Sequence, residues 1–160
     1  MSGLSPPVEA VERFRTDLAS LIGGAPVMLG VAVSGGADSL ALLLLGNAAL
    51  PGRVEAATVD HGLRPEALQE AHFVASICGR LGLSHEILRP TVPIEGNVQS
   101  GARQARYFLL EEWRRKHGLD WLATAHHADD QAETLLMRLN RGSGVAGLSG
   151  VRAVNRRVVR

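Results

Sequence analysis

The residues best suited to chemistry in this chain form the run Ser34-Gly-Gly-Ala-Asp-Ser39, which lies between two apolar segments. This order predicts a strand, a tight turn and the start of a helix. Adjacent glycines allow a sharp turn and the close approach of a ligand, and the amides at a helix start form a concave anion site. The serine hydroxyls would add donors, and Asp38 would hold a divalent cation against phosphate oxygens. The run therefore predicts a phosphate site, although it lacks the Lys of a Walker loop. The alternative is a turn that enters a helix without binding a ligand.

A second polar run, Thr124 to Thr134, follows the fourth predicted strand and contains Asp129 and Asp130. One of these aspartates should cap the helix that follows, which leaves the other to bind metal together with Asp38. The sequence does not decide between them, and a cap beside a solvated acidic turn is the alternative. His126 and the histidine that follows it precede the aspartates. The run lacks the i,i+4 histidine pair of a helical zinc site, which argues against a transition-metal site.

The turn Asp60-His61-Gly62 follows the second predicted strand. A metal-binding Asp-His pair is one interpretation, which the glycine at the third position weakens. The more economical interpretation is that Val59, at the strand end, and His61 receive the adenine and ribose of a nucleotide. A purely structural histidine is equally open.

Arg103 and Arg106 lie three residues apart near the start of a predicted helix and therefore share one helix face. Facing the site, they would neutralise charge that develops on a transferring phosphoryl group. Facing water, they would be solvated cations, which is the better interpretation for either arginine taken alone.

An alternation of helices and strands positions these runs. Right-handed crossovers between the strands predict the α/β class, with a parallel sheet covered by helices on both faces. Because ligands of such sheets bind beyond the carboxyl ends of the strands, the runs after the first, second and fourth strands should line one site. The spacing of apolar residues, with Pro and Gly at the boundaries, predicts helices over 6–22, from the first polar run to 49, and over 65–81, 97–117 and 129–140. The same reasoning predicts strands over 27–33, 53–59, 84–88 and 119–125. A glycine-rich loop is expected over 141–150.

Composition bounds the class of protein. The 160 residues, 46% hydrophobic and 21% charged, predict one globular domain without a membrane span or a secretory signal. Cys78, as a single cysteine, excludes an internal disulfide and a Cys-x-x-Cys site, and we expect it to be an inert core residue of a cytoplasmic protein. The formal net charge is +1, but the last ten residues carry four arginines and no acid. The rest of the chain therefore has more acidic than basic residues, which argues against nucleic-acid binding over its whole surface. The tail resembles an interrupted strand, which predicts a domain that is incomplete at its C-terminus.

The run at 34–39 resembles the SGGxDS signature of the PP-loop ATP pyrophosphatases. Together with further segments in matching order, the chain resembles one family of them, the tRNA(Ile)-lysidine synthases. The segments are VDHGLR (59–64), ARQARY (102–107), AHHADDQAET (125–134) and LNRGSGVAGLSG (139–150).

This resemblance implies an adenine nucleotide alpha hydrolase-like, Rossmann-like three-layer fold. It also implies a ligase that adenylates the wobble cytidine of isoleucine tRNA with a CAU anticodon, releases pyrophosphate, and joins free L-lysine to that cytidine. ATP and Mg2+ would be its cofactors, no membrane would be involved, and a homodimer stays open. The resemblance also implies further C-terminal domains that help bind tRNA, and we expect these to be absent from the 160 residues.

The resemblance also implies roles for individual residues. The backbone from Ser34 to Ser39 would hold the pyrophosphate portion of ATP. Asp38 would hold magnesium with Asp129 or Asp130, and Arg106 would stabilise phosphate charge, with Arg103 as a second candidate for this role. The nucleotide-binding residues are then Ser34, Gly35, Gly36, Ala37, Asp38, Ser39, Val59, His61, Arg103 and His126. Two alternatives are a PP-loop adenylating enzyme with a small-molecule substrate and an ATP-binding module without catalysis.

Overall fold

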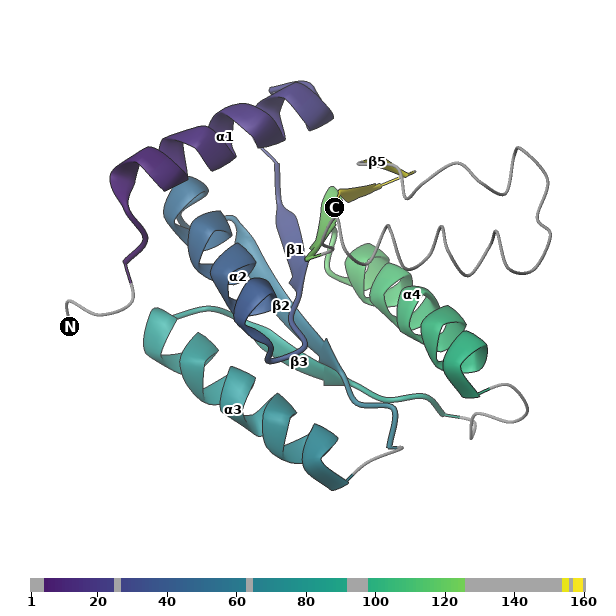
Figure 1. Cartoon of the computed structure of the whole chain (residues 1–160). Helices are drawn as coiled ribbons and strands as arrows, with labels where there is room; N and C mark the ends of the chain where they lie inside the picture. Colours follow the sequence, from purple (N-terminus) through teal and green to yellow (C-terminus); the bar gives the residue numbers. More distant parts are fainter. Residues whose placement is uncertain are drawn as a thin grey trace, which may run out of the picture.

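A sheet of mainly parallel strands, with helices on both faces, organises the protein (Figure 1). The computed structural model describes residues 5–24, 27–62, 65–91, 98–125, 154–155 and 157–159. Within these residues the strand order is β3-β2-β1-β4-β6-β5. The elements are α1 (Val8–Ile22), β1 (Leu29–Ala32), α2 (Ala37–Ala49), β2 (Val54–Val59), α3 (Pro65–Leu81), β3 (His85–Leu88), α4 (Val98–Lys116), β4 (Trp121–Thr124), β5 (Val154–Asn155) and β6 (Val158–Val159).

The central strands run in the same direction and in close register. Ala32, the last residue of β1, pairs with Ala57 of β2 on one side and with Thr124 of β4 on the other. Val59, at the end of β2, pairs with Leu88, at the end of β3. The carboxyl ends of these strands therefore meet at one edge of the sheet, which is where parallel α/β sheets bind their ligands.

Side chains alternate between the two faces of each strand, so the sheet has a hydrophobic core on each side. On one side the core joins the strands to α2 and α3, with members such as Val31, Leu43 and Val74. On the other side it joins them to α4 through Leu110 and Trp113. Figure 1 shows the same layers, with α1 lying across the carboxy-terminal end of α2, where Nε of Arg15 donates to the Ala49 carbonyl (3.3 Å).

Gly30 is what allows α4 to approach the sheet closely. A Cβ at this position would lie 2.6 Å from Cζ3 of Trp113 and 2.9 Å from Cδ1 of Leu119. Any side chain there would occupy the space that the Trp113 ring fills. The indole of the helix is thus packed against a bare strand backbone in the middle of the sheet.

The expected α/β class and helix–strand order are confirmed for the described residues. The helix predicted over 65–81 has those bounds, and the helix predicted to 117 ends at Lys116, with Gly118 at a φ of 63°. The strand predicted over 119–125 is shorter, because the Leu119 N–H donates to the Arg114 carbonyl at the end of α4. A strand is present in the tail as β6, parallel to β4, and β5 pairs with it in the antiparallel sense. The helix and loop predicted over 129–150 lie outside the described residues.

Candidate functional site

The turn after β1 is held by the hydroxyl group of Ser39. This nearly buried oxygen donates to the Gly36 carbonyl (2.9 Å) and accepts from the backbone N–H (3.1 Å) and the hydroxyl (3.2 Å) of Ser34. Its one proton and two lone pairs are therefore all used. These three bonds join Ser34, Gly36 and Ser39 and hold the turn from within.

The backbone of this turn needs glycine at position 35. Gly35 has a φ of 93°, in the left-handed region that other residues rarely adopt, and it lies against Glu70 and Val74 of α3. Gly36 then precedes the first residue of α2, and its carbonyl accepts from the Leu40 N–H (3.1 Å). Ser34, Gly36, Ala37 and Asp38 are exposed at this helix start. The arrangement offers an accessible helix N-terminus, with its partial positive charge, to an anion.

The turn after β2 is tied to the end of β3 by one buried carboxylate. Asp60 is only 5% exposed. Its Oδ1 accepts from the Gly62 N–H (2.9 Å), and its Oδ2 accepts from Nε of Arg89 (3.0 Å). The backbone N–H of Asp60 donates to the carbonyl of Leu88 (2.9 Å). These contacts fix the position of His61 between Asp60 and Gly62.

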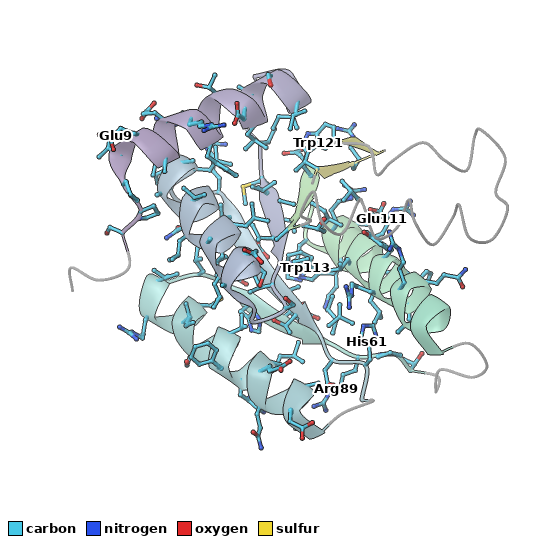
Figure 2. The ribbon with its side chains drawn as sticks, viewed as in Figure 1. Glu9, His61, Arg89, Glu111, Trp113 and Trp121 are labelled. Atoms are coloured by element: carbon cyan, nitrogen blue, oxygen red, sulfur yellow. The ribbon has the colours of Figure 1, made fainter. Side chains whose placement is uncertain are left out.

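The His61 side chain carries buried polar atoms without a partner among the described residues. Both ring nitrogens are inaccessible to water, and neither has a hydrogen bond there. Burial, and secondly the nearby charge of Arg106, lower the pKa of His61 below its usual 6.5, while Asp60 opposes the shift. A neutral ring presents one N–H donor and one acceptor. Figure 2 labels His61 and Arg89 at the same end of the sheet.

The two arginines expected in the site differ in their surroundings. Arg106 is exposed on α4, close enough to His61 to affect its pKa. Arg103 is also exposed, but its guanidinium carbon lies 5.9 Å from the centre of the Tyr107 ring, in a cation–π contact. Arg106 therefore lies near the turn after β2, whereas Arg103 packs on the ring of Tyr107 in the same helix.

Of the other residues expected in the site, one lies in the part of the chain that the structure describes and three lie outside it. Val59 is half-buried at the end of β2, directly before Asp60. His126, Asp129 and Asp130 lie outside the described residues, so their roles stay predictions. Within the described ranges no group of three or more His, Cys, Asp or Glu residues is arranged to hold a metal ion. Likewise, none of the described helices is long and apolar enough to cross a membrane.

Sequence reasoning missed Arg89, which is the first residue after β3. The rule that selected the runs after the other strands would have found it, because its position is also a strand end. Cys78 was predicted to be an inert core residue, and this is confirmed. It is fully buried in α3, and burial raises the pKa of its thiol to about 11.

A parallel sheet with a glycine-rich anion turn after its central strand is an arrangement of nucleotide-binding α/β domains. The PP-loop domain family matches residues 12–160, and the chain belongs to this family. The expected membership of the PP-loop enzymes is therefore confirmed.

Two individual relatives show which kind of PP-loop protein this chain is similar to. The chain is 57% identical over 125 residues to the tRNA(Ile)-lysidine synthase of Zymomonas mobilis, covering 78% of this chain and 38% of the relative. It is 50% identical over 146 residues to the tRNA(Ile)-lysidine synthase of Novosphingobium aromaticivorans, covering 91% and 44%. The chain thus spans less than half of the length of these relatives.

Among solved structures, a U34-tRNA thiolase from Methanococcus maripaludis superimposes with a TM-score of 0.69 at 19% identity. The match covers 86% of this chain and 52% of the thiolase. At this identity the match bears on the fold alone, and it confirms the expected α/β arrangement.

Proposed function

We propose that this chain is the ATP-binding part of an enzyme that joins lysine to the wobble cytidine of isoleucine tRNA with a CAU anticodon. The observation that carries the proposal is the 50% identity, over 91% of the chain, to a protein named tRNA(Ile)-lysidine synthase. The accessible helix start after β1 supports it, because such a site suits the phosphates of ATP.

The proposed reaction has two displacement steps. The C2 oxygen of the cytidine attacks the α-phosphorus of ATP, the bond to the bridging oxygen breaks, and pyrophosphate leaves. The ε-amine of free L-lysine then attacks C2, the C2–oxygen bond breaks, and AMP leaves with that oxygen while the amine loses a proton. No covalent intermediate on the enzyme is needed, so the protein acts by positioning the reactants and stabilising charge. These substrates are those of the cytoplasm, where we propose that the protein acts.

We assign the phosphate end of ATP to the turn after β1. Its backbone, preset by Ser39, would accept the pyrophosphate portion at the start of α2. Asp38, exposed in the first turn of α2, fits a magnesium ligand because carboxylate oxygens suit this ion, and Asp129 or Asp130 would supply the second carboxylate. Magnesium would contribute neutralisation of phosphate charge.

We assign the adenosine half to the turn after β2. Val59 ends the strand there, and His61 holds a neutral donor and acceptor without a partner in the described chain. Arg106 would stabilise charge on the phosphoryl group, and its surroundings favour it over Arg103 for this role. His126 completes the proposed nucleotide-binding set.

Incorporation of labelled lysine into RNA tests this proposal. The protein, ATP and magnesium are incubated with isoleucine tRNA carrying a CAU anticodon, or with a tRNA of another anticodon as the control. We expect lysine in the first tRNA alone, with the label in its wobble nucleoside by mass spectrometry. Asp38→Asn should abolish incorporation, whereas Asp17→Asn, at an exposed position of α1, should not. Release of pyrophosphate without any tRNA would instead favour a small-molecule substrate and contradict the proposal.

A further inference from the structure

We infer that Arg89 is a positioning residue for nucleotide recognition: through Asp60 it fixes the turn on which His61 contacts the adenosine half of ATP. This inference rests on the proposed ATP site but not on the identity of the second substrate. Arg89 belongs to none of the motifs that suggested the function, and it lies 29 residues from its partner in the chain.

The Asp60 carboxylate is the centre of the arrangement. With 5% exposure it is cut off from water, and a buried charge of this kind requires a partner. Arg89 supplies the partner at 3.0 Å, from a side chain that is itself 56% exposed. The other carboxylate oxygen accepts from the Gly62 N–H, two residues further along the same turn. One side chain therefore connects the end of β3 to both sides of His61.

The surroundings of His61 explain why its position matters. Its two buried ring nitrogens have no partner among the described residues, and such atoms carry a free-energy penalty that a ligand can remove. Burial and Arg106 lower the pKa of His61, so the ring is neutral at pH 7. A neutral donor and acceptor match a base edge or a ribose hydroxyl, which are polar and uncharged, better than they match a phosphate.

Arg89 also controls the charge beside His61. The charged groups that face this ring from the described elements are Asp60 on its own turn and Arg106 on α4. While Arg89 is paired with Asp60, its positive charge balances the negative charge of the carboxylate, and the carboxylate is directed toward the end of β3. Without Arg89, the buried carboxylate would lose its cationic partner beside His61, and this change in local charge would alter the recognition surface.

The turn that is proposed to bind the phosphates should not sense this change. The three hydrogen bonds of the Ser39 hydroxyl join Ser34, Gly36 and Ser39, and none of these three bonds involves the turn after β2. Loss of Arg89 is therefore expected to separate the two halves of ATP binding. A general folding defect would weaken both halves together.

Calorimetric titration with two probes tests the inference. Each variant is titrated with ATP and with inorganic tripolyphosphate, both with magnesium, and GTP is used to measure base selectivity. Arg89→Gln should weaken ATP binding by about tenfold and reduce the preference for ATP over GTP, with tripolyphosphate binding unchanged. Arg89→Lys, which keeps the charge near Asp60, should recover part of the loss. Arg13→Gln, which removes another Arg–Asp pair on exposed α1, is the matched control and should bind all three ligands normally.

The outcomes separate this inference from the proposed function. Equal weakening of ATP and tripolyphosphate in Arg89→Gln, or unchanged ATP binding and selectivity, would overturn the role of Arg89 while the ATP site stands. Failure of the unaltered protein to bind ATP would overturn the proposed site, and the inference with it.

Discussion

The hydroxyl of Ser39 offers the sharpest perturbation of the turn after β1, because it alone satisfies both ends of that turn. Ser39→Ala removes the acceptor of the Ser34 N–H and the donor to the Gly36 carbonyl. The Ser34 hydroxyl also loses its acceptor. The substitution deletes one oxygen and leaves the surrounding core in place, so its effect should be confined to the shape of the turn.

The size of the effect follows from the contacts that are lost. A hydrogen bond of this type contributes about 0.5–1.5 kcal/mol net. The two bonds to backbone groups then stabilise the turn by about 1–3 kcal/mol. If this energy holds the turn in its binding shape, affinity for pyrophosphate falls by roughly 5- to 150-fold, since about 1.4 kcal/mol corresponds to tenfold.

Calorimetry with pyrophosphate and magnesium measures the change in affinity, and urea unfolding measures the accompanying loss of stability. Ser20→Ala is the matched control, because its hydroxyl donates to the Asp17 carbonyl on the exposed face of α1, far in sequence from the turn. We expect normal pyrophosphate binding in that variant. Normal binding in Ser39→Ala would refute the reasoning, because the turn would then hold its shape without the hydroxyl.

Three other predictions concern packing and pH. Gly30→Ala should destabilise the protein by about 1–3 kcal/mol in urea unfolding, because the new Cβ would lie 2.6 Å from the Trp113 ring; Gly79→Ala, with open space around it, is the control, and equal effects would contradict the packing argument. The Arg114 side chain, by hydrogen bonding, lowers the pKa of Glu111 from its usual 4.5 to about 2, so the pair stabilises the fold above pH 4.5 and this contribution is lost as the pH falls toward 2. Glu111→Gln should therefore flatten the acid side of the stability profile, and an unchanged slope would show that the pair is not formed. The pKa of His61 is below 6.5 in the folded protein, so the unfolded chain binds more protons and the stability of the fold decreases as the pH drops below 6.5. ATP affinity should decrease over the same pH range. If His61→Gln shows the same loss of ATP affinity at low pH, His61 is not the group responsible.

The helices were predictable because their boundaries are marked locally. Pro65 starts α3, and Gly118 follows the end of α4, so residue type alone gave these bounds. The expectation that polar runs after strands share one edge also required only the order of elements. The registers of β1 with β2 and β4 agree with it.

Contacts across long stretches of chain were not predictable. The Arg89–Asp60 pair joins two strand ends that are neighbours only in the sheet, so the position of each residue after its own strand did not indicate that the two side chains would pair. The contact of Trp113 with Gly30 depends on how α4 crosses the sheet, which no periodic pattern specifies. The antiparallel β5 was missed because two residues are too short to give an alternating pattern.

The most direct test of the central claim is to identify which phosphate bond of ATP is broken. ATP labelled in its α-phosphate and, in a parallel reaction, ATP labelled in its γ-phosphate are incubated with the protein, magnesium, lysine and isoleucine tRNA with a CAU anticodon, and the products are separated by chromatography. An ATP pyrophosphatase site after β1 predicts AMP and pyrophosphate in equal amounts, both dependent on the tRNA and both lost in Asp38→Asn. Formation of ADP and inorganic phosphate would contradict the claim, because it would mean cleavage at the γ-phosphate.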